Sequence, residues 1–201
     1  MSTSPEMALR ARHLPGDLAM WLFILAELTV FAILIIVFAV AQHLDVEGFR
    51  AGRAQLDLST ALALTLTLLT AGLCAALAVE QVRHGRQRHA AALLGVAVLL
   101  GLAHVVLKSG EYHHLASRGL DLEYSTFFTL FWLITGFHFL HVLLGLVILG
   151  WMTLRCQRGA YRGAYRGDAL GGLESGALYW HMVDLVWVVL FPLVYVLAPG
   201  S

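Results

Sequence analysis

Two ionisable side chains, His181 and Asp184, lie within an apolar stretch near the C-terminus of the sequence. Their spacing of three places both on one face of an α-helix. A carboxylate that faces lipid costs about 2.5–3.5 kcal/mol on insertion scales, so such residues usually face protein and pair with a partner. We therefore expect His181 and Asp184 to meet polar groups from elsewhere in the chain or from another subunit.

A second pair, His138 and His141, has the same spacing within another apolar stretch. Two histidines so placed could ligate a metal ion or a haem. A catalytic metal site would also need a third ligand and an open coordination position, and the chain lacks the pair of Glu-x-x-His motifs found in diiron bundles. Hydrogen bonds from these histidines to Asp184 or Glu27 on other helices are therefore the favoured interpretation. We predict one buried polar seam of five residues: His138, His141, Glu174, His181 and Asp184.

Glu27 lies between a third and half of the way along the first apolar stretch. Hydrocarbon favours the neutral form of a carboxyl group unless a cation or a hydrogen-bond donor meets it. Two interpretations are open for such a residue: a proton-handling or modulatory site, or a neutral carboxyl group that makes a hydrogen bond between packed helices.

Three further polar residues, His104, Lys108 and Glu111, share one face near the end of their helix. We predict that Lys108 and Glu111 form an ion pair at the membrane interface, where a long lysine side chain extends toward water.

The composition explains why these residues stand out. The chain has 201 residues, of which 59% are hydrophobic and 13% charged, and its formal net charge is zero. This balance is typical of a membrane protein and argues against a nucleic-acid partner, which would require a basic excess. The two cysteines, Cys74 and Cys156, imply no disulfide framework or metal site, and we expect free thiols.

The elements that must position the polar residues are five apolar stretches, each long enough to cross a hydrocarbon core of about 30 Å as a helix. They span residues 18–42, 56–80, 89–109, 126–154 and 176–197. We therefore predict an all-α, polytopic membrane protein with a cytoplasmic N-terminal tail (1–17) and one five-helix transmembrane domain (18–201). Small residues such as Gly136 and Gly145 are expected to let another helix approach closely.

The distribution of basic residues predicts the orientation, because cytoplasmic loops retain positive charge. Nine of the thirteen Lys and Arg residues lie in the tail, the second connector and the fourth connector, counted along the sequence. These segments face one side of the membrane if the spans alternate. The chain is therefore predicted to run with its N-terminus inside and its C-terminus outside.

Several motifs together resemble subunit III of the haem-copper oxidases, the family of cytochrome c and ubiquinol oxidases. Residues 174–187 (ESGALYWHMVDLVW) resemble the final-helix signature of that subunit. Residues 135–145 (TGFHFLHVLLG) are similar to its Thr-Gly-Phe-His-x-x-His-Val-x-x-Gly motif, residues 109–112 to its Ser-Glu-Tyr helix end, and residues 20–31 to its first glutamate-containing helix. The motifs follow the order of the family over nearly the whole chain.

The resemblance implies a five-helix form that lacks the first two helices of longer members. It implies a non-catalytic subunit of an oxidoreductase complex in a bacterial-type cytoplasmic membrane, surrounded by lipids, with no cofactor or metal of its own. Haem and copper, or haem and iron, would reside in the catalytic partner subunit, which this chain would stabilise. Glu27 matches the buried, carbodiimide-reactive glutamate of the family, which implies an influence on proton uptake.

Two alternatives remain. Short relatives include the accessory subunit of nitric oxide reductases, which the opening around Pro15 and Gly16 also resembles. A stand-alone membrane metalloenzyme or small transporter would instead use His138, His141, His181 and Asp184 as its functional groups.

Overall fold

A computed structural model describes residues 18–161 and 166–197, with side chains in the second range from residue 170 onward. All regular secondary structure in these ranges is helical, which confirms the predicted all-α class. The predicted cytoplasmic tail, residues 1–17, lies outside the described residues.

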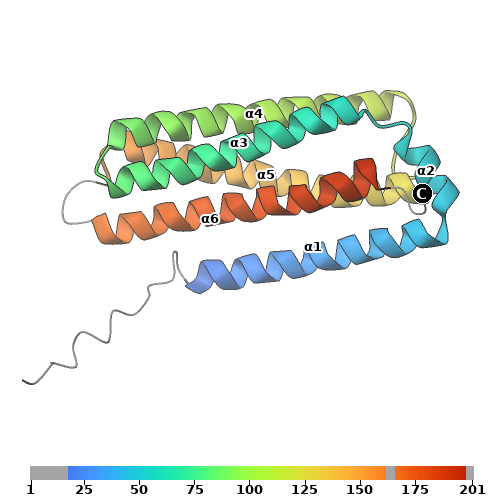
Figure 1. Cartoon of the computed structure of the whole chain (residues 1–201), viewed down its shortest axis with the longest axis horizontal. Coiled ribbons are helices and arrows are strands. Elements are labelled where there is room, and N and C mark those ends of the chain that lie inside the picture. The colour runs from blue at the N-terminus through green and yellow to red at the C-terminus, as the bar shows by residue number, and fades with distance from the viewer. Residues whose placement is uncertain (1–17, 162–165, 198–201) are drawn as a thin grey trace, which may run out of the picture.

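The chain forms six α-helices and a short π-helical segment in the described ranges (Figure 1). In order these are α1 (Leu18–Leu44), α2 (Val46–Arg53), α3 (Leu58–Arg83), α4 (Gln87–Ser117), α5 (Thr126–Gln157), α6 (Arg166–Phe191) and η3 (Pro192–Val196). Among the described residues, five helices are long and apolar enough to cross a membrane: α1, α3, α4, α5, and α6 continued by η3. This confirms the predicted number of helices with the length and composition of membrane spans.

The long helices form one bundle with unequal shielding. In Figure 1, α6 runs between α3 and α1, and α5 lies behind it. Close packing of α3 is possible because the buried side of this helix carries many small residues, including Ala61, Ala71, Gly72, Ala75 and Ala78. By contrast, only 17% of the most apolar 18-residue stretch of α1 is buried inside the bundle, against 50% of the corresponding stretch of the last span. Most of α1 is therefore free to face lipid or another protein.

The short helix α2 was not predicted, because the sequence around it reads as a polar connector. Its ends nevertheless carry residues that stabilise helix termini. At the N-terminus, the side chain of Asp45 accepts a hydrogen bond from the backbone N–H of Gly48. In the last turn, Arg50 and Arg53 place positive charge at the C-terminal end of the helix dipole. At the start of α3, Asp57 accepts hydrogen bonds from Thr60 and Ser59, which lower the pKa of this exposed carboxyl group to about 2.

Arg53 joins α2 to the C-terminal segment. Its side chain is buried and donates to the backbone oxygens of Val194 at 2.9 Å and Leu193 at 3.1 Å, and to the side-chain oxygen of Gln42 at 2.7 Å. Gln42 in turn donates to the backbone oxygen of Leu197 at 3.2 Å. A helix end leaves its last carbonyl groups without intrahelical donors, and here Arg53 and Gln42 supply the donors.

The glycines on α5 differ in what they contact. A Cβ atom at Gly145 would lie 2.8 Å from the ring of Trp180 on α6, so the glycine is required for this close approach. The expectation was wrong for Gly136, where a Cβ atom would meet nothing within 4 Å.

This contrast predicts the effect of two matched substitutions. Gly145→Ala should lower the free energy of unfolding by about 1–3 kcal/mol, because the rigid Trp180 ring must move. Gly136→Ala should be neutral or stabilising by up to about 1 kcal/mol, because alanine favours the helix. Denaturation of the purified protein in detergent micelles measures both values, and equal losses at the two sites would contradict this account of the α5–α6 contact.

Candidate functional site

The bundle holds its membrane-embedded charges in pairs, and the first pair joins α1 to α5. Nε2 of His141 lies 3.0 Å from a carboxylate oxygen of Glu27. Nδ1 of the same ring lies 2.8 Å from the backbone oxygen of Phe137. This is one of the two interhelical hydrogen bonds favoured from the sequence.

The geometry of His141 limits where its protons can lie. A backbone oxygen only accepts hydrogen bonds, so Nδ1 must be the donor to Phe137. The contact between Nε2 and Glu27 then requires one proton, carried either by a neutral carboxyl group that donates to the ring or by a charged imidazolium that donates to the carboxylate. The pair is thus a single-proton site placed between two helices.

His138 lies deeper in the bundle, with a ring that is buried and stacked on Trp187 at 5.2 Å between centroids. Neither of its ring nitrogens has a hydrogen-bond partner in the ranges that the structure describes. Trp187 also makes a T-shaped contact with His104 at 5.5 Å between centroids, and Nδ1 of His104 donates to the backbone oxygen of Leu64 on α3 at 3.0 Å. His138 therefore faces inward, as expected, but does not bond to Glu27 or Asp184.

Asp184 fills a notch in α3. A Cβ atom at Gly72 would overlap with its carboxylate oxygen, so only glycine fits opposite this group. The same oxygen lies 3.2 Å from Nδ1 of His181 on the same helix. The partner of Asp184 in the described chain is thus its own neighbour at a spacing of three residues, rather than a histidine of α5.

Glu174 does not join the other buried groups. It forms an ion pair with Arg83 at the end of α3, with 2.8 Å between nitrogen and oxygen. It lies seven residues before His181, or about 10 Å along the helix at 1.5 Å per residue. The polar residues predicted to form one seam are therefore separated into the Glu27–His141 pair, the isolated His138, the His181–Asp184 pair and the Arg83–Glu174 pair.

Lys108 and Glu111 form the predicted ion pair, with 2.6 Å between Nζ and a carboxylate oxygen. Their side chains do not extend toward water, because only 1% and 6% of them are exposed. The hydroxyl group of Tyr195 completes the cluster: it accepts from Lys108 at 2.9 Å and donates to Glu111 at 2.9 Å. Aromatic rings surround Nζ, at centroid distances of 4.8 Å for Tyr112, 4.9 Å for Phe131 and 5.3 Å for Trp187.

Sequence reasoning missed Tyr195 and also Tyr179, whose hydroxyl group donates to the backbone oxygen of His141 at 3.1 Å. Both tyrosines lie in the last apolar span, where a hydroxyl group must find a partner when it is buried. This requirement was the only indication in the sequence that the two hydroxyl groups would make hydrogen bonds. It did not indicate which distant residue would meet each hydroxyl group.

No group of three or more His, Cys, Asp or Glu residues that could hold a metal ion occurs within residues 18–161 and 166–197. The four residues of the metalloenzyme alternative belong to different contacts: His141 bonds to Glu27, and His181 bonds to Asp184. Chemically, the described pairs can hold or exchange protons and can bind a polar partner.

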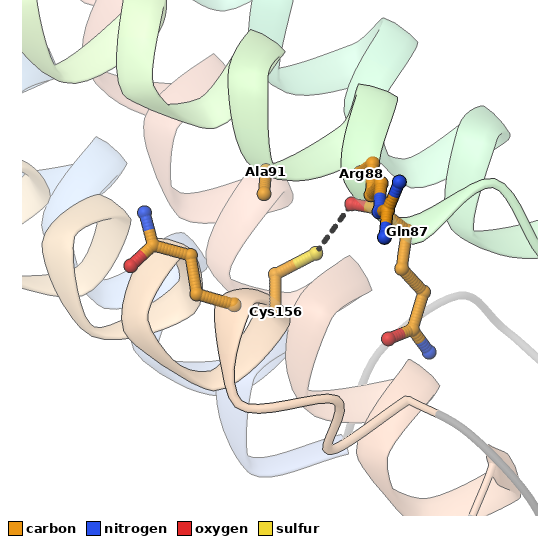
Figure 2. Close-up of a pocket in the computed structure, with 5 residues that line it drawn as sticks. Gln87, Arg88, Ala91 and Cys156 are labelled. Atoms are coloured by element: carbon orange, nitrogen blue, oxygen red, sulfur yellow. Dashed lines mark hydrogen bonds between the residues drawn. The ribbon is translucent and has the colours of Figure 1, made fainter.

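A separate hollow lies between the ends of α4 and α5 (Figure 2). The thiol of Cys156 donates there to the backbone oxygen of Gln87 at 3.3 Å. Neither Cys156 nor Cys74 is in a disulfide, as expected. Cys156 lies fifteen residues after His141, or about 22 Å along α5, so this hollow is remote from the Glu27–His141 pair.

Comparisons with known proteins agree on one family. Residues 15–198 match the family described as Cytochrome c oxidase subunit III. The chain is 31% identical over 177 residues to the cytochrome bo(3) ubiquinol oxidase subunit 3 of Pseudomonas aeruginosa, covering 88% of this chain and 82% of that protein. It is 29% identical over 182 residues to a probable quinol oxidase subunit 3 of Staphylococcus epidermidis, covering 90% and 89%.

A probable cytochrome c oxidase subunit 3 of Rickettsia bellii is 34% identical over 132 residues, which is 66% of this chain but only 46% of that longer protein. These relatives are all described as subunits of oxidases. The nitric oxide reductase alternative therefore receives no support from them.

The buried Lys108 cluster predicts a large effect of removing one charge. Glu111→Gln should lower the free energy of unfolding by about 3–5 kcal/mol, because it leaves an uncompensated buried lysine. The double variant Lys108→Met, Glu111→Leu should recover most of that loss.

The exposed pair of Glu47 and Arg50, 3.6 Å apart, provides the control. Glu47→Gln should cost less than about 1 kcal/mol, because solvent screens such pairs. Denaturation in detergent micelles compares the variants. A loss at Glu111 no greater than the loss at Glu47 would show that the buried pair is not a structural requirement.

Proposed function

The chain belongs to the cytochrome c oxidase subunit III family, and on this premise we propose that it serves its terminal oxidase as a non-catalytic membrane subunit that stabilises the catalytic subunit and modulates proton uptake. The observation that carries the proposal is the Glu27–His141 contact, which holds one proton between two helices within the membrane spans. The haem and metal centres belong, in this proposal, to the catalytic partner subunit, and Glu27 acts on protons rather than on electrons.

The position of Glu27 supports this role. It is the tenth residue of α1, about 14 Å from the start of that helix at 1.5 Å per residue. Its side chain remains 22% exposed on the helix that is least enclosed by the bundle. The carboxyl group therefore reaches the surface of the subunit, whereas the Lys108–Glu111 pair is enclosed.

The proposed orientation places the N-terminus and the α3–α4 connector in the cytoplasm. This follows the excess of Lys and Arg in the segments around Arg86 and Arg158, as the positive-inside rule requires. The subunit spans the membrane several times, and its bacterial relatives favour a cytoplasmic membrane. With this orientation, Glu27 lies in the cytoplasmic half of the span, on the side from which protons are taken up.

The experiment that tests the function combines affinity purification from native membranes with labelling by a hydrophobic carbodiimide. We expect a haem-bearing subunit to co-purify and Glu27 to be labelled, because the reagent needs a protonated carboxyl group in an apolar setting. Glu27→Gln should abolish labelling and leave the complex and its haem spectrum intact, while sustained turnover or proton coupling declines.

Glu174→Gln is the matched control. Glu174 is ion-paired with Arg83, so its replacement should leave the labelling of Glu27 unchanged. Loss of assembly in Glu27→Gln would make the residue a packing group. Loss of a haem or metal signal with assembly intact would refute the non-catalytic assignment.

The orientation has its own test. A reporter enzyme fused after Ser201 should be active on the periplasmic side, and the same reporter inserted at Gly85 should be active in the cytoplasm, because the two positions are expected at opposite ends of the bundle. The reverse pattern would refute the prediction from basic residues.

A further inference from the structure

His181 is a polar group at the surface of the last span. Its side chain is 42% exposed, whereas that of its partner Asp184 is 12% exposed. The residue lies eleven positions after Leu170, where the span begins, or about 16 Å along the helix. A hydrocarbon core is about 30 Å thick, so His181 lies near the middle of the bilayer.

The surface around His181 is apolar. On α6, Leu178, Leu185 and Val188 continue the same face at helical spacing. On α3, Leu69 and Leu73 are exposed on either side of Gly72, the glycine that contacts the Asp184 carboxylate. The α3/α6 face, defined here by these five apolar residues and His181, thus presents one imidazole within a surface of leucine and valine.

The hydrogen-bonding capacity of His181 is only half used. Nδ1 meets Asp184, and Nε2 has no partner among the residues that the structure describes. Three other ionisable groups within the spans, Glu27, Lys108 and Glu111, are less exposed than His181, with less than a quarter of each side chain exposed. Acyl chains offer no hydrogen bond to an imidazole, and ionisable residues at this depth almost always face protein or a water-filled cavity.

We propose that the α3/α6 face is the docking surface for a transmembrane helix of another subunit of the oxidase, and that this helix carries a hydrogen-bonding side chain that meets Nε2 of His181. The inference rests on the proposed function for the existence of that partner. A helix is the expected partner because backbone at this depth must satisfy its own hydrogen bonds. The His181–Asp184 pair would then fix the register of the two subunits, since apolar contacts alone discriminate poorly within lipid.

Site-specific photocrosslinking in native membranes tests the proposal. Leu185→p-benzoylphenylalanine places the probe one turn from His181, and Leu140→p-benzoylphenylalanine places it on an exposed site of α5, the helix behind α6 in Figure 1. On irradiation, we expect Leu185 to crosslink to a different subunit, identified by mass spectrometry. The control at Leu140 should give lipid adducts. Lipid adducts alone at Leu185, or a crosslink to a second copy of this chain, would overturn the proposal.

Substitution of His181 in the Leu185 probe background tests the hydrogen bond. His181→Leu should reduce the yield of the crosslink about three- to tenfold, as expected for the loss of one interhelical hydrogen bond. His181→Gln should retain most of the yield because its amide can still bond. Equal yields in all three proteins would overturn the role of His181.

The proposed function and the docking surface can fail independently of each other. If no haem protein co-purifies with the unmodified chain, the proposed function fails. If the complex forms normally but Leu185 labels only lipid, the docking surface alone is wrong.

Discussion

The fold depends on the absence of water inside a bilayer, where a buried polar group has only protein groups available as hydrogen-bond partners. Apolar packing specifies helix neighbours weakly in lipid, because lipid tails are as apolar as leucine. Polar contacts therefore determine which helices meet. Glu27 and His141 join α1 to α5, His104 joins α4 to the backbone of α3, and Trp187 on α6 donates to Thr65 on α3 at 2.9 Å.

These contacts fall into two kinds. The Lys108–Glu111–Tyr195 cluster is enclosed by aromatic rings and holds its charges out of reach of solvent and lipid. The Glu27–His141 and His181–Asp184 pairs reach the surface of α1 and α6. Of the pairs that reach the surface, we propose that Glu27–His141 holds a proton and that His181–Asp184 binds a neighbouring subunit.

The sequence was sufficient for features that depend on one helix at a time. Length and hydropathy predicted the five spans, and a spacing of three predicted the Lys108–Glu111 contact. Features that depend on two distant segments were harder. The helical period shows which residues share a face but not which faces meet. Glu174, which was grouped with the polar residues of α5 and α6, pairs with Arg83 on α3, and Tyr195, which lies 84 positions after Glu111, was missed.

The contact of Arg53 with the carbonyl groups of residues 193 and 194 has a consequence for biosynthesis. Arg53 leaves the ribosome about 140 residues before its acceptors, so the guanidinium must remain hydrated at the membrane surface until translation is nearly complete. The C-terminal end of α1 and the short α2 helix therefore reach their final packing only after the last span has been inserted. A nascent chain truncated before η3 would lack two of the three hydrogen-bond acceptors of Arg53. An arginine left in this state on an apolar bundle distinguishes an incomplete subunit from one ready to enter the complex.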